Sequence, residues 1–474
     1  TFFDGKAIYL VNRNAERYLK ETEGLSRAQK KDYKEKANKK AKGLLLLGVL
    51  SDLGILLVLK YFNFFAENAN KGLRFLGFQL PMLHLLLPLG ISFYTLQAVA
   101  YLVDIYRNKL KPDTNLGKFM LFMSFFPQIV QGPIARHAHL AHQLYEGHKF
   151  SYERFTFGLQ LILWGWMKKL IIADRVMIPV GQIFDNYQQY TGLIVFLGAV
   201  LYGVQVYMDF SGGMDIARGV SQILGIELEL NFRQPYFATS VEEFWRKWHI
   251  TLGAWMRDYV FYPLSLSKSF ASLSRKTRKI FGQFVGKRMP AFLASFIVYL
   301  LVGIWHGPEW KYLAYGVWNG MIIMISILLV NVYAKMRSVC GIRETAFTWR
   351  AFQMFRTFIL MSMGRFFSRA GGFLPAVEMM ARSAKQWYNL AFLVDGSLIR
   401  LGLDNANWIL LLIALIVIFG VDCLHEKGVF IRGAIARQPL IFRWMIYIGA
   451  ILILLVFGSY GPGYDSASFI YEQF

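Results

Sequence analysis

The feature that most constrains the fold is a series of long apolar runs separated by basic clusters. Residues 291–305, AFLASFIVYLLVGIW, contain no charge, and residues 43–65 contain only Asp52 and Lys60. About 20 apolar residues cross a bilayer as one helix, and a chain in lipid must satisfy its backbone polar groups internally. Because 55% of the 474 residues are hydrophobic, we predict an all-α, polytopic transmembrane helical protein.

The remaining apolar runs differ in continuity. Residues 80–103 contain Pro88 and Gly90, and residues 119–135 contain two prolines and a glycine. Because these residues break helices, we predict discontinuous or re-entrant elements there. Residues 371–406 are mostly polar and are predicted to form a loop, extracytoplasmic by position. The other predicted spans are 154–175, 191–210, 312–332, 351–367, 407–422 and 440–458.

The basic residues lie between the apolar runs. The formal net charge is +22, but no nucleic-acid-binding module is recognisable, so we expect these cations to contact membrane lipids and not nucleic acid. Residues 12–42 hold eleven Lys or Arg against five Asp or Glu, and residues 265–290 hold seven Lys or Arg and no acid. The positive-inside rule predicts a cytoplasmic basic linker helix at 12–42 and a cytoplasmic basic loop at 265–290.

One segment, residues 241–264, is unusually polar for its surroundings. At helical spacing Trp245, Trp248 and Trp255 share one face, and Arg246 and His249 lie on the neighbouring stripe. We predict an interfacial or re-entrant helix that forms the functional centre. The alternative is an aromatic belt helix whose arginines reach the headgroups.

A second polar intrusion is His306, which ends the uncharged run 291–305. A histidine at the end of such a run is costly unless it has a partner. Two interpretations stay open from the residues alone: a functional imidazole in a desolvated site, or a helix-end histidine at the headgroup level beside Trp305.

Buried carboxylates are predicted near the end of the run 191–210. Gln205 and Asp209 are intramembrane polar groups, and a Gly-Gly pair lies between Asp209 and Asp215. Glycine permits a sharp turn, so the backbone can turn sharply there. We also expect these carboxylates to pair with a cation, for which the candidates are Arg218, Arg246 and Arg257.

No metal site is predicted. Cys340 and Cys423 are far apart and lack metal-type spacing. The four histidines at 137, 139, 142 and 148 are close in sequence, but no carboxylate or cysteine completes an evident ligand set. We therefore favour a polar interfacial loop over a metal cluster for this stretch.

Two motifs carry a resemblance to a known family. FWRKWHITLGAWMRDYVFYPL (244–264) and LVGIWHGPEWKYLAYGVWNG (301–320) resemble the membrane-bound O-acyltransferase family, in its bacterial alginate O-acetyltransferase-like and teichoic acid D-alanyltransferase-like branch. Residues 88–107, 125–136 and 201–219 support the resemblance. It implies a single transmembrane domain over 1–474 with a central channel, in the bacterial cytoplasmic membrane. It also leads us to expect further membrane helices before Thr1.

The resemblance also implies residue roles. His306 would be the catalytic base, and His249 would orient the donor or acceptor. Asn319 would orient an imidazole or an acyl carbonyl. Arg246 and Arg257 could bind donor phosphates, although Arg257 could equally pair with a carboxylate. The substrate-binding candidates are Trp245, Trp248, Trp255, Arg246, Arg257, Asp258, Gln205, Asp209 and Asn319.

The implied reaction is O-acyl transfer. The donor would be acetyl-CoA or another acyl thioester, no cofactor would be bound permanently, and the acceptor would be an extracytoplasmic cell-surface polysaccharide. Transfer would be direct or would pass through an extracytoplasmic partner protein. Buried polarity alone also fits a transporter or flippase for a lipid-linked or polysaccharide substrate, or a scaffold that recruits a separate acetyltransferase. The resemblance favours acyl transfer.

Overall fold

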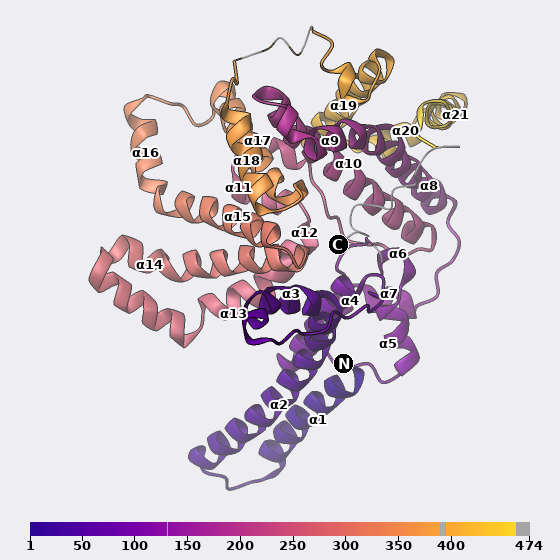
Figure 1. The fold of residues 1–474 in the computed structure, drawn as a ribbon. Helices are drawn as coiled ribbons and strands as arrows, with labels where there is room; N and C mark the ends of the chain where they lie inside the picture. The colour runs from indigo at the N-terminus through magenta and orange to yellow at the C-terminus, as the bar shows by residue number, and fades with distance from the viewer. Residues whose placement is uncertain (130, 389, 391, 393–394, 461–474) are drawn as a thin grey trace. The chain divides into compact units, whose positions relative to one another are not determined.

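The computed structural model describes residues 1–129, 131–388, 390, 392 and 395–460. Within these ranges the regular structure is helical, and the one β pairing is a bridge between Phe232 and Trp248. Seven helices of the described chain are long and apolar enough to cross a membrane, which confirms the prediction of an all-α polytopic protein (Figure 1). They are Arg27–Leu76, Tyr152–Asp185, Leu193–Ile223, Lys268–His306, Trp310–Leu328, Asn405–Glu426 and Leu440–Phe457.

The chain divides into two compact units. The first comprises Thr1–Phe150 together with Leu224–Glu229, and the second comprises Ser151–Ile223 together with Leu230–Phe474. Both motif histidines therefore lie within the second unit.

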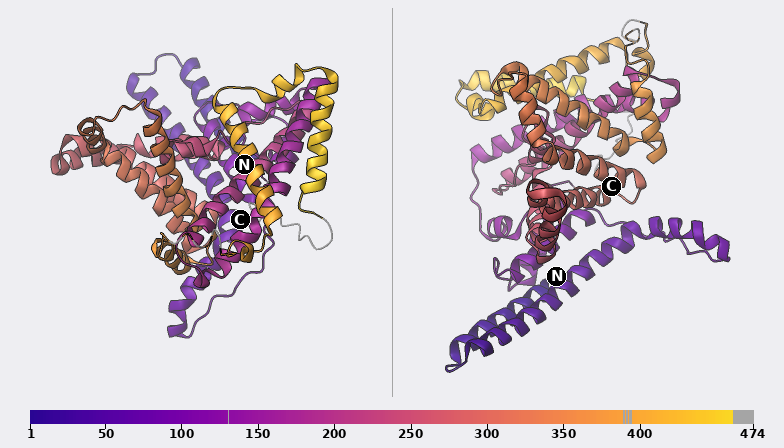
Figure 2. Two further views of the ribbon diagram at one scale, coloured as in Figure 1. Left: turned by 90° about the horizontal axis from the view of Figure 1, so that it is seen from above. Right: turned by 90° about the vertical axis from the view of Figure 1, so that its left-hand side faces the viewer.

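A helical hairpin begins the first unit. Helix α1, Phe2–Glu21, packs beside α2, Arg27–Leu56, as Figures 1 and 2 show. Helix α2 starts after Ser26, whose hydroxyl accepts a hydrogen bond from the backbone N–H of Gln29 and so caps the helix. The predicted single linker helix at 12–42 is therefore wrong in detail, because this segment crosses the turn of a hairpin.

The helix breaks predicted in the first unit are confirmed. Residues 77–90 are non-helical, and α4, Ile91–Tyr106, begins directly after Gly90, which has a φ of +74°. A side chain there would also collide with the carbonyl oxygen of Ile129. The segment predicted to be re-entrant is likewise broken into short pieces. The remaining helices of this unit are α3 (Phe62–Leu73), α5 (Leu116–Met123), α6 (Phe126–Ile129) and α7 (His137–Tyr145).

The second unit is built around the crossing of α8, Tyr152–Trp166, with α10, Leu193–Ile223. A Cβ on Gly165 of α8 would lie 2.5 Å from the carbonyl oxygen of Gly212 on α10. Two turns earlier on α8, a Cβ on Gly158 would likewise collide with the carbonyl oxygen of Gly219. The sharp turn that glycine would permit beside Asp209 is therefore not formed. The helix runs straight through, and its glycines instead permit two backbones to approach closely.

The predicted interfacial helix at 241–264 is not continuous. It consists of α11, Val241–Lys247, α12, Ile250–Met256, a π-helical turn and the short α13, Tyr262–Ser265. His249 interrupts it with a φ of +46°. The prediction that Trp245, Trp248 and Trp255 share one face assumed a continuous helix. It therefore does not hold across the break between α11 and α12.

Helix α14, Lys268–His306, and α15, Trp310–Leu328, form the second close hairpin (Figure 1). A side chain on Gly303 or Gly316 would collide with the backbone of the opposite helix. This contact holds the end of α14, and with it His306, against the first turns of α15.

Two predicted loops contain helices. The basic stretch 265–290 forms the first part of α14, with a break at Gly282, where φ is +79°. Lysine and arginine are good helix formers, so their charge does not prevent this. Residues 371–406 include α18, Phe373–Ala384. The other helices of this unit are α9 (Asp174–Asp185), α16 (Val330–Val339), α17 (Phe347–Arg369), α19 (Asn405–Glu426), α20 (Ile431–Ala436) and α21 (Leu440–Phe457).

The glycine crossing of α8 and α10 makes a stability prediction. Gly165→Ala should force the helices apart and destabilise the fold by about 1–3 kcal/mol. Gly181→Ala is the matched control within the same span, since its Cβ would meet only the Asp185 carboxylate at 3.7 Å. We expect a lower melting temperature in detergent for Gly165→Ala alone. Equal melting temperatures for the two variants would contradict the role of this crossing.

Candidate active site

His249 is held at a short backbone pairing. The backbone N–H of Arg233 donates to the carbonyl oxygen of Lys247 at 3.0 Å, and the N–H of Ile250 donates to the carbonyl oxygen of Asn231 at 3.0 Å. Between these bonds His249 takes the left-handed conformation, as the N-cap of α12. This conformation costs a non-glycine residue about 1–3 kcal/mol, so the surrounding hydrogen bonds must hold it in place.

The side chain of Asn231 fixes the tautomer of His249. Its Oδ1 accepts hydrogen bonds from the backbone N–H and the hydroxyl of Thr251, at 2.9 and 2.8 Å. The same oxygen lies 3.4 Å from Nδ1 of His249. Because Oδ1 can only accept, Nδ1 must carry the hydrogen, which leaves the lone pair on Nε2.

His249 is neutral in this environment. It lies outside the seven membrane spans, yet its side chain is only 2% exposed. Burial, and then the nearby His306, hold the pKa of His249 well below its ordinary value of 6.5. A neutral imidazole with a defined acceptor nitrogen can accept a hydrogen bond or a proton.

The structure brings the two predicted histidines together around Trp305. The Trp305 ring lies 5.9 Å from the His249 ring and 5.2 Å from the His306 ring, measured between centroids. His306 also faces the ring of Tyr315 at 5.9 Å and that of Tyr312 at 6.4 Å. Trp305, Tyr312 and Tyr315 are buried, so the side of His306 that faces these rings lies against aromatic surface, although His306 itself is half-buried.

Unsatisfied polar atoms surround the Tyr315 ring. Asn319 donates from Nδ2 to the Tyr315 carbonyl oxygen at 2.8 Å, while its Oδ1 has no hydrogen-bond partner among the described residues. The indole of Trp245 lies 6.4 Å from the Tyr315 ring, and within the same described part of the chain its buried Nε1 is also unsatisfied. A buried acceptor and a buried donor of this kind have hydrogen bonds to offer a ligand.

Arg365 is a further buried group that sequence reasoning did not assign. Its guanidinium lies 4.8 Å from the centre of the Trp248 ring. Its positive charge also interacts electrostatically with the side chains of Tyr236 and Tyr315. Trp248 in turn stacks on Phe244 with an interplanar angle of 15°. The available signal was an arginine within the mostly apolar run 351–367, which also contains Arg356; an arginine is a costly residue in such a place. Asn231 gave no comparable signal.

Several predicted site residues lie elsewhere. Arg246 pairs with Glu242 at 2.8 Å on an exposed face of α11, and Arg257 pairs with Asp258 at 2.9 Å. The alternative of a carboxylate pair for Arg257 is thus confirmed. Trp255 is buried against Tyr259. Gln205 is buried within α10, and its Oε1 lacks a hydrogen-bond partner in the described ranges.

Of the two carboxylates, Asp209 pairs with a cation that was not predicted, and Asp215 pairs in part with one that was. Lys169 Nζ lies 2.7 Å from Asp209 and 2.9 Å from Asp174. The prediction of Arg246 or Arg257 as the partner of Asp209 is wrong. Asp215 pairs with Lys168 at 2.7 Å and with the predicted Arg218 at 3.6 Å. Both lysines come from the π-helical turn Met167–Ala173, which presents them toward α10.

The histidine-rich stretch of the first unit forms a hydrogen-bonded cluster. His137 Nε2 lies 2.6 Å from Asp113, and the Tyr145 hydroxyl donates to the same carboxylate at 2.8 Å. His148 contacts the carbonyl oxygen of Gln143 at 2.6 Å. Across the described residues, no group of three or more His, Cys, Asp or Glu is placed to bind a metal ion.

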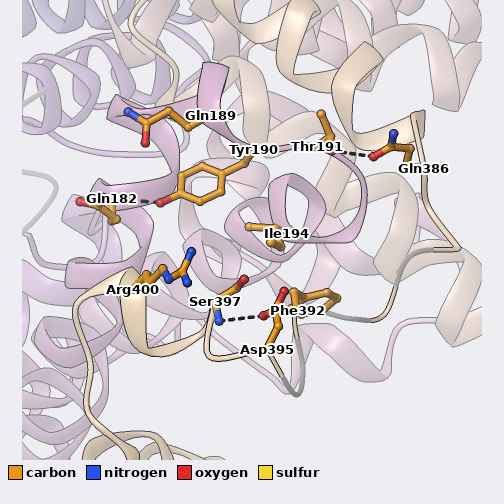
Figure 3. Close-up of a pocket in the computed structure, with 10 residues that line it drawn as sticks. All are labelled: Gln182, Gln189, Tyr190, Thr191, Ile194, Gln386, Phe392, Asp395, Ser397 and Arg400. Atoms are coloured by element: carbon orange, nitrogen blue, oxygen red, sulfur yellow. Dashed lines mark hydrogen bonds between the residues drawn. The ribbon is translucent and has the colours of Figure 1, made fainter.

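A separate polar pocket of about 400 Å³ lies in the second unit. Figure 3 shows the Tyr190 ring within it, with its hydroxyl toward Gln182 at 3.5 Å, and the Thr191 hydroxyl bonded to Gln386 at 3.2 Å. Arg400 lines the same pocket. An aromatic face surrounded by amides, hydroxyls and one cation suits a hydroxyl-rich ligand.

The buried state of His249 predicts a pH dependence of stability. Below about pH 6.5 the unfolded chain binds a proton that folded His249 excludes, so the free energy of unfolding should fall as the pH falls. His249→Gln should flatten this slope between about pH 5 and 6.5, measured by thermal unfolding. His139→Gln, at an exposed position, serves as the control. An unchanged slope in His249→Gln would contradict a buried neutral imidazole.

Comparison with known proteins places these residues in context. The model of the membrane-bound O-acyltransferase family matches residues 109–367. The probable alginate O-acetylase AlgI of Pseudomonas syringae is 33% identical over 69% of this chain and 57% of its own length. The peptidoglycan O-acetyltransferase of Helicobacter pylori is 30% identical over 59% and 54%, respectively. The teichoic acid D-alanyltransferase of Streptococcus thermophilus is 29% identical over 50% and 56%. The chain thus spans little more than half the length of these relatives.

Proposed function

Since the chain belongs to the membrane-bound O-acyltransferase family, we propose that it transfers an acetyl group from cytosolic acetyl-CoA to a hydroxyl group. That hydroxyl belongs to an extracytoplasmic cell-surface polysaccharide, and the transfer is direct or passes through a partner protein. It would act in the bacterial cytoplasmic membrane. The observation that carries the proposal is the meeting of the two motif histidines at Trp305, one of which, His249, is buried and has its tautomer fixed by Asn231. The relatives, which are named for transfer to alginate, peptidoglycan and teichoic acid, support the substrate class.

In the proposed reaction, His306 carries one proton from the acceptor hydroxyl to the leaving thiolate. The acceptor hydroxyl attacks the thioester carbonyl while His306 takes its proton. The carbon–sulfur bond then breaks, and the same proton goes to the leaving thiolate. His249 stays neutral and positions a reactant through the lone pair on Nε2. The buried donor Nε1 of Trp245 and the Asn319 side chain are the proposed hydrogen-bonding groups for substrate.

The exposed arginines have a separate proposed role. Arg246 and Arg257 stay our candidates for the donor phosphates, because guanidinium groups match phosphate oxygens. Their present carboxylate partners, Glu242 and Asp258, would have to yield. Exposed ion pairs contribute about 0–1 kcal/mol, so this exchange costs little.

Charge bias supports the placement of the polar pocket on the acceptor side. Residues 186–192, between α9 and α10, contain no Lys or Arg, whereas the connection 427–439 between α19 and α21 contains three. Arg432 of that connection bonds to Phe157 and Gln222, at the ends of α8 and α10 remote from residues 186–192. The positive-inside rule then favours a cytoplasmic position for 427–439 and an extracytoplasmic position for the pocket.

The histidine assignment is tested by transfer of labelled acetyl from acetyl-CoA. The purified protein is placed in liposomes with candidate polysaccharides and any partner protein on the outer side. His306→Ala should lower the rate by about 10²–10⁴-fold, which is the usual worth of a general base. His249→Ala should lose less, and His139→Ala should retain the wild-type rate. Unchanged transfer by His306→Ala would overturn the catalytic assignment.

The acceptor pocket is tested by Arg400→Ala. We expect the KM for the polysaccharide to rise about tenfold, as for loss of one charged hydrogen bond, with no change in the KM for the donor. Lys385 lies, like Arg400, in the connection between α18 and α19, but at an exposed position. Lys385→Ala therefore removes one charge and serves as the matched control. Equal effects of the two substitutions would show a general charge effect and not recognition in the pocket.

A further inference from the structure

A second and larger cavity, of about 750 Å³, lies in the second unit. It is lined by α8, α10, residues 230–234, α19 and the connection that leads into α21. Much of its wall is aliphatic and comes from membrane-spanning helices, as with Leu161, Met167 and Ile446. Helix α21 has no fully buried residue, as expected of an apolar helix that faces lipid on its outer side.

The same cavity contains an excess of positive charge. Its lining includes the cations Lys168, Arg218, Arg233 and Arg432 against the carboxylates Asp215 and Asp422. Because Asp215 is shared between Lys168 and Arg218, one carboxylate serves two cations. The cavity is therefore suited to an anion.

Two guanidinium groups are placed to hold that anion. The buried Nε of Arg218 has no hydrogen-bond partner among the residues that the structure describes. Arg432 donates to the Phe157 carbonyl oxygen at 3.0 Å and to the Gln222 amide oxygen at 3.1 Å, both of which are uncharged. Burial, and then the charge of Arg218, lower the pKa of Arg432, so the two cations act on each other. An anion between them would relieve this repulsion.

The ligand must combine an anionic group with an apolar body. A soluble nucleotide would present its polar ribose and base to the aliphatic wall, whereas a phospholipid supplies acyl chains that match it. The connection containing Arg432 is cytoplasmic by charge bias, and the cytoplasmic leaflet carries anionic phospholipids. Guanidinium groups bind phosphate oxygens in paired geometry.

We propose that this cavity binds an anionic membrane phospholipid, with its phosphate between Arg218 and Arg432 and its acyl chains along the wall formed by α8 and α21. The site does not depend on the acyl-transfer proposal, since binding can be measured without turnover. It does adjoin the candidate active site, because Asn231 lines the cavity and also holds Nδ1 of His249.

The test measures lipid retained by the purified full-length protein with native mass spectrometry. The protein is extracted from membranes and exchanged into detergent with phosphatidylglycerol or phosphatidylcholine. We expect wild type to retain phosphatidylglycerol in preference to phosphatidylcholine, and the double variant Arg218→Gln/Arg432→Gln to lose about tenfold or more in affinity. The control, Lys427→Gln/Arg437→Gln, removes the same charge from exposed positions of the same connection and should bind as wild type.

A second variant separates the binding site from the fold. Ala450→Trp fills the apolar wall while leaving every cation in place, and it should also abolish retention of phosphatidylglycerol. Equal binding by the double variant and its control would overturn the proposal. So would equal retention of the two lipids, or displacement of phosphatidylglycerol by coenzyme A, which would assign the cavity to a nucleotide donor.

Discussion

The hydrogen bonds to Asn231 are the interaction on which the candidate site depends. One carboxamide oxygen serves the first turn of α12 and the ring of His249 together. It thereby sets a strained backbone conformation and a ring tautomer at once. Because the two requirements share an atom, the imidazole cannot turn independently of the helix that follows it, and its acceptor nitrogen is prearranged for substrate.

Sequence reasoning succeeded where the physics was local. Apolar run length identified the seven candidate spans but also predicted one at 351–367 that is not among them, and Pro88 and Gly90 marked a real break. It failed where glycine had two possible uses. In water a Gly-Gly pair favours a turn, but within a membrane helix it permits close packing, as at Gly212.

Long-range partners were the other class of failure. Lys169 is 40 positions from Asp209, and Asn231 is 18 positions from His249, so neither pairing has a periodic signature. The positive φ of His249 was also invisible, because only a few per cent of non-glycine residues take this conformation and a single residue identity does not reveal it. The two histidines could be named from the sequence and the motifs, but their common contact with Trp305 required the fold.

The ion triad of Lys169, Asp174 and Asp209 bears on how the protein enters the membrane. Each of these charges alone costs about 2.5–3.5 kcal/mol at the centre of a membrane helix. Lys169 and Asp174 belong to one span and Asp209 to the next, so Asp209 meets its cation only when both spans are present. The two helices should therefore partition into lipid as a pair, and the unit of biogenesis here is the hairpin and not the single span.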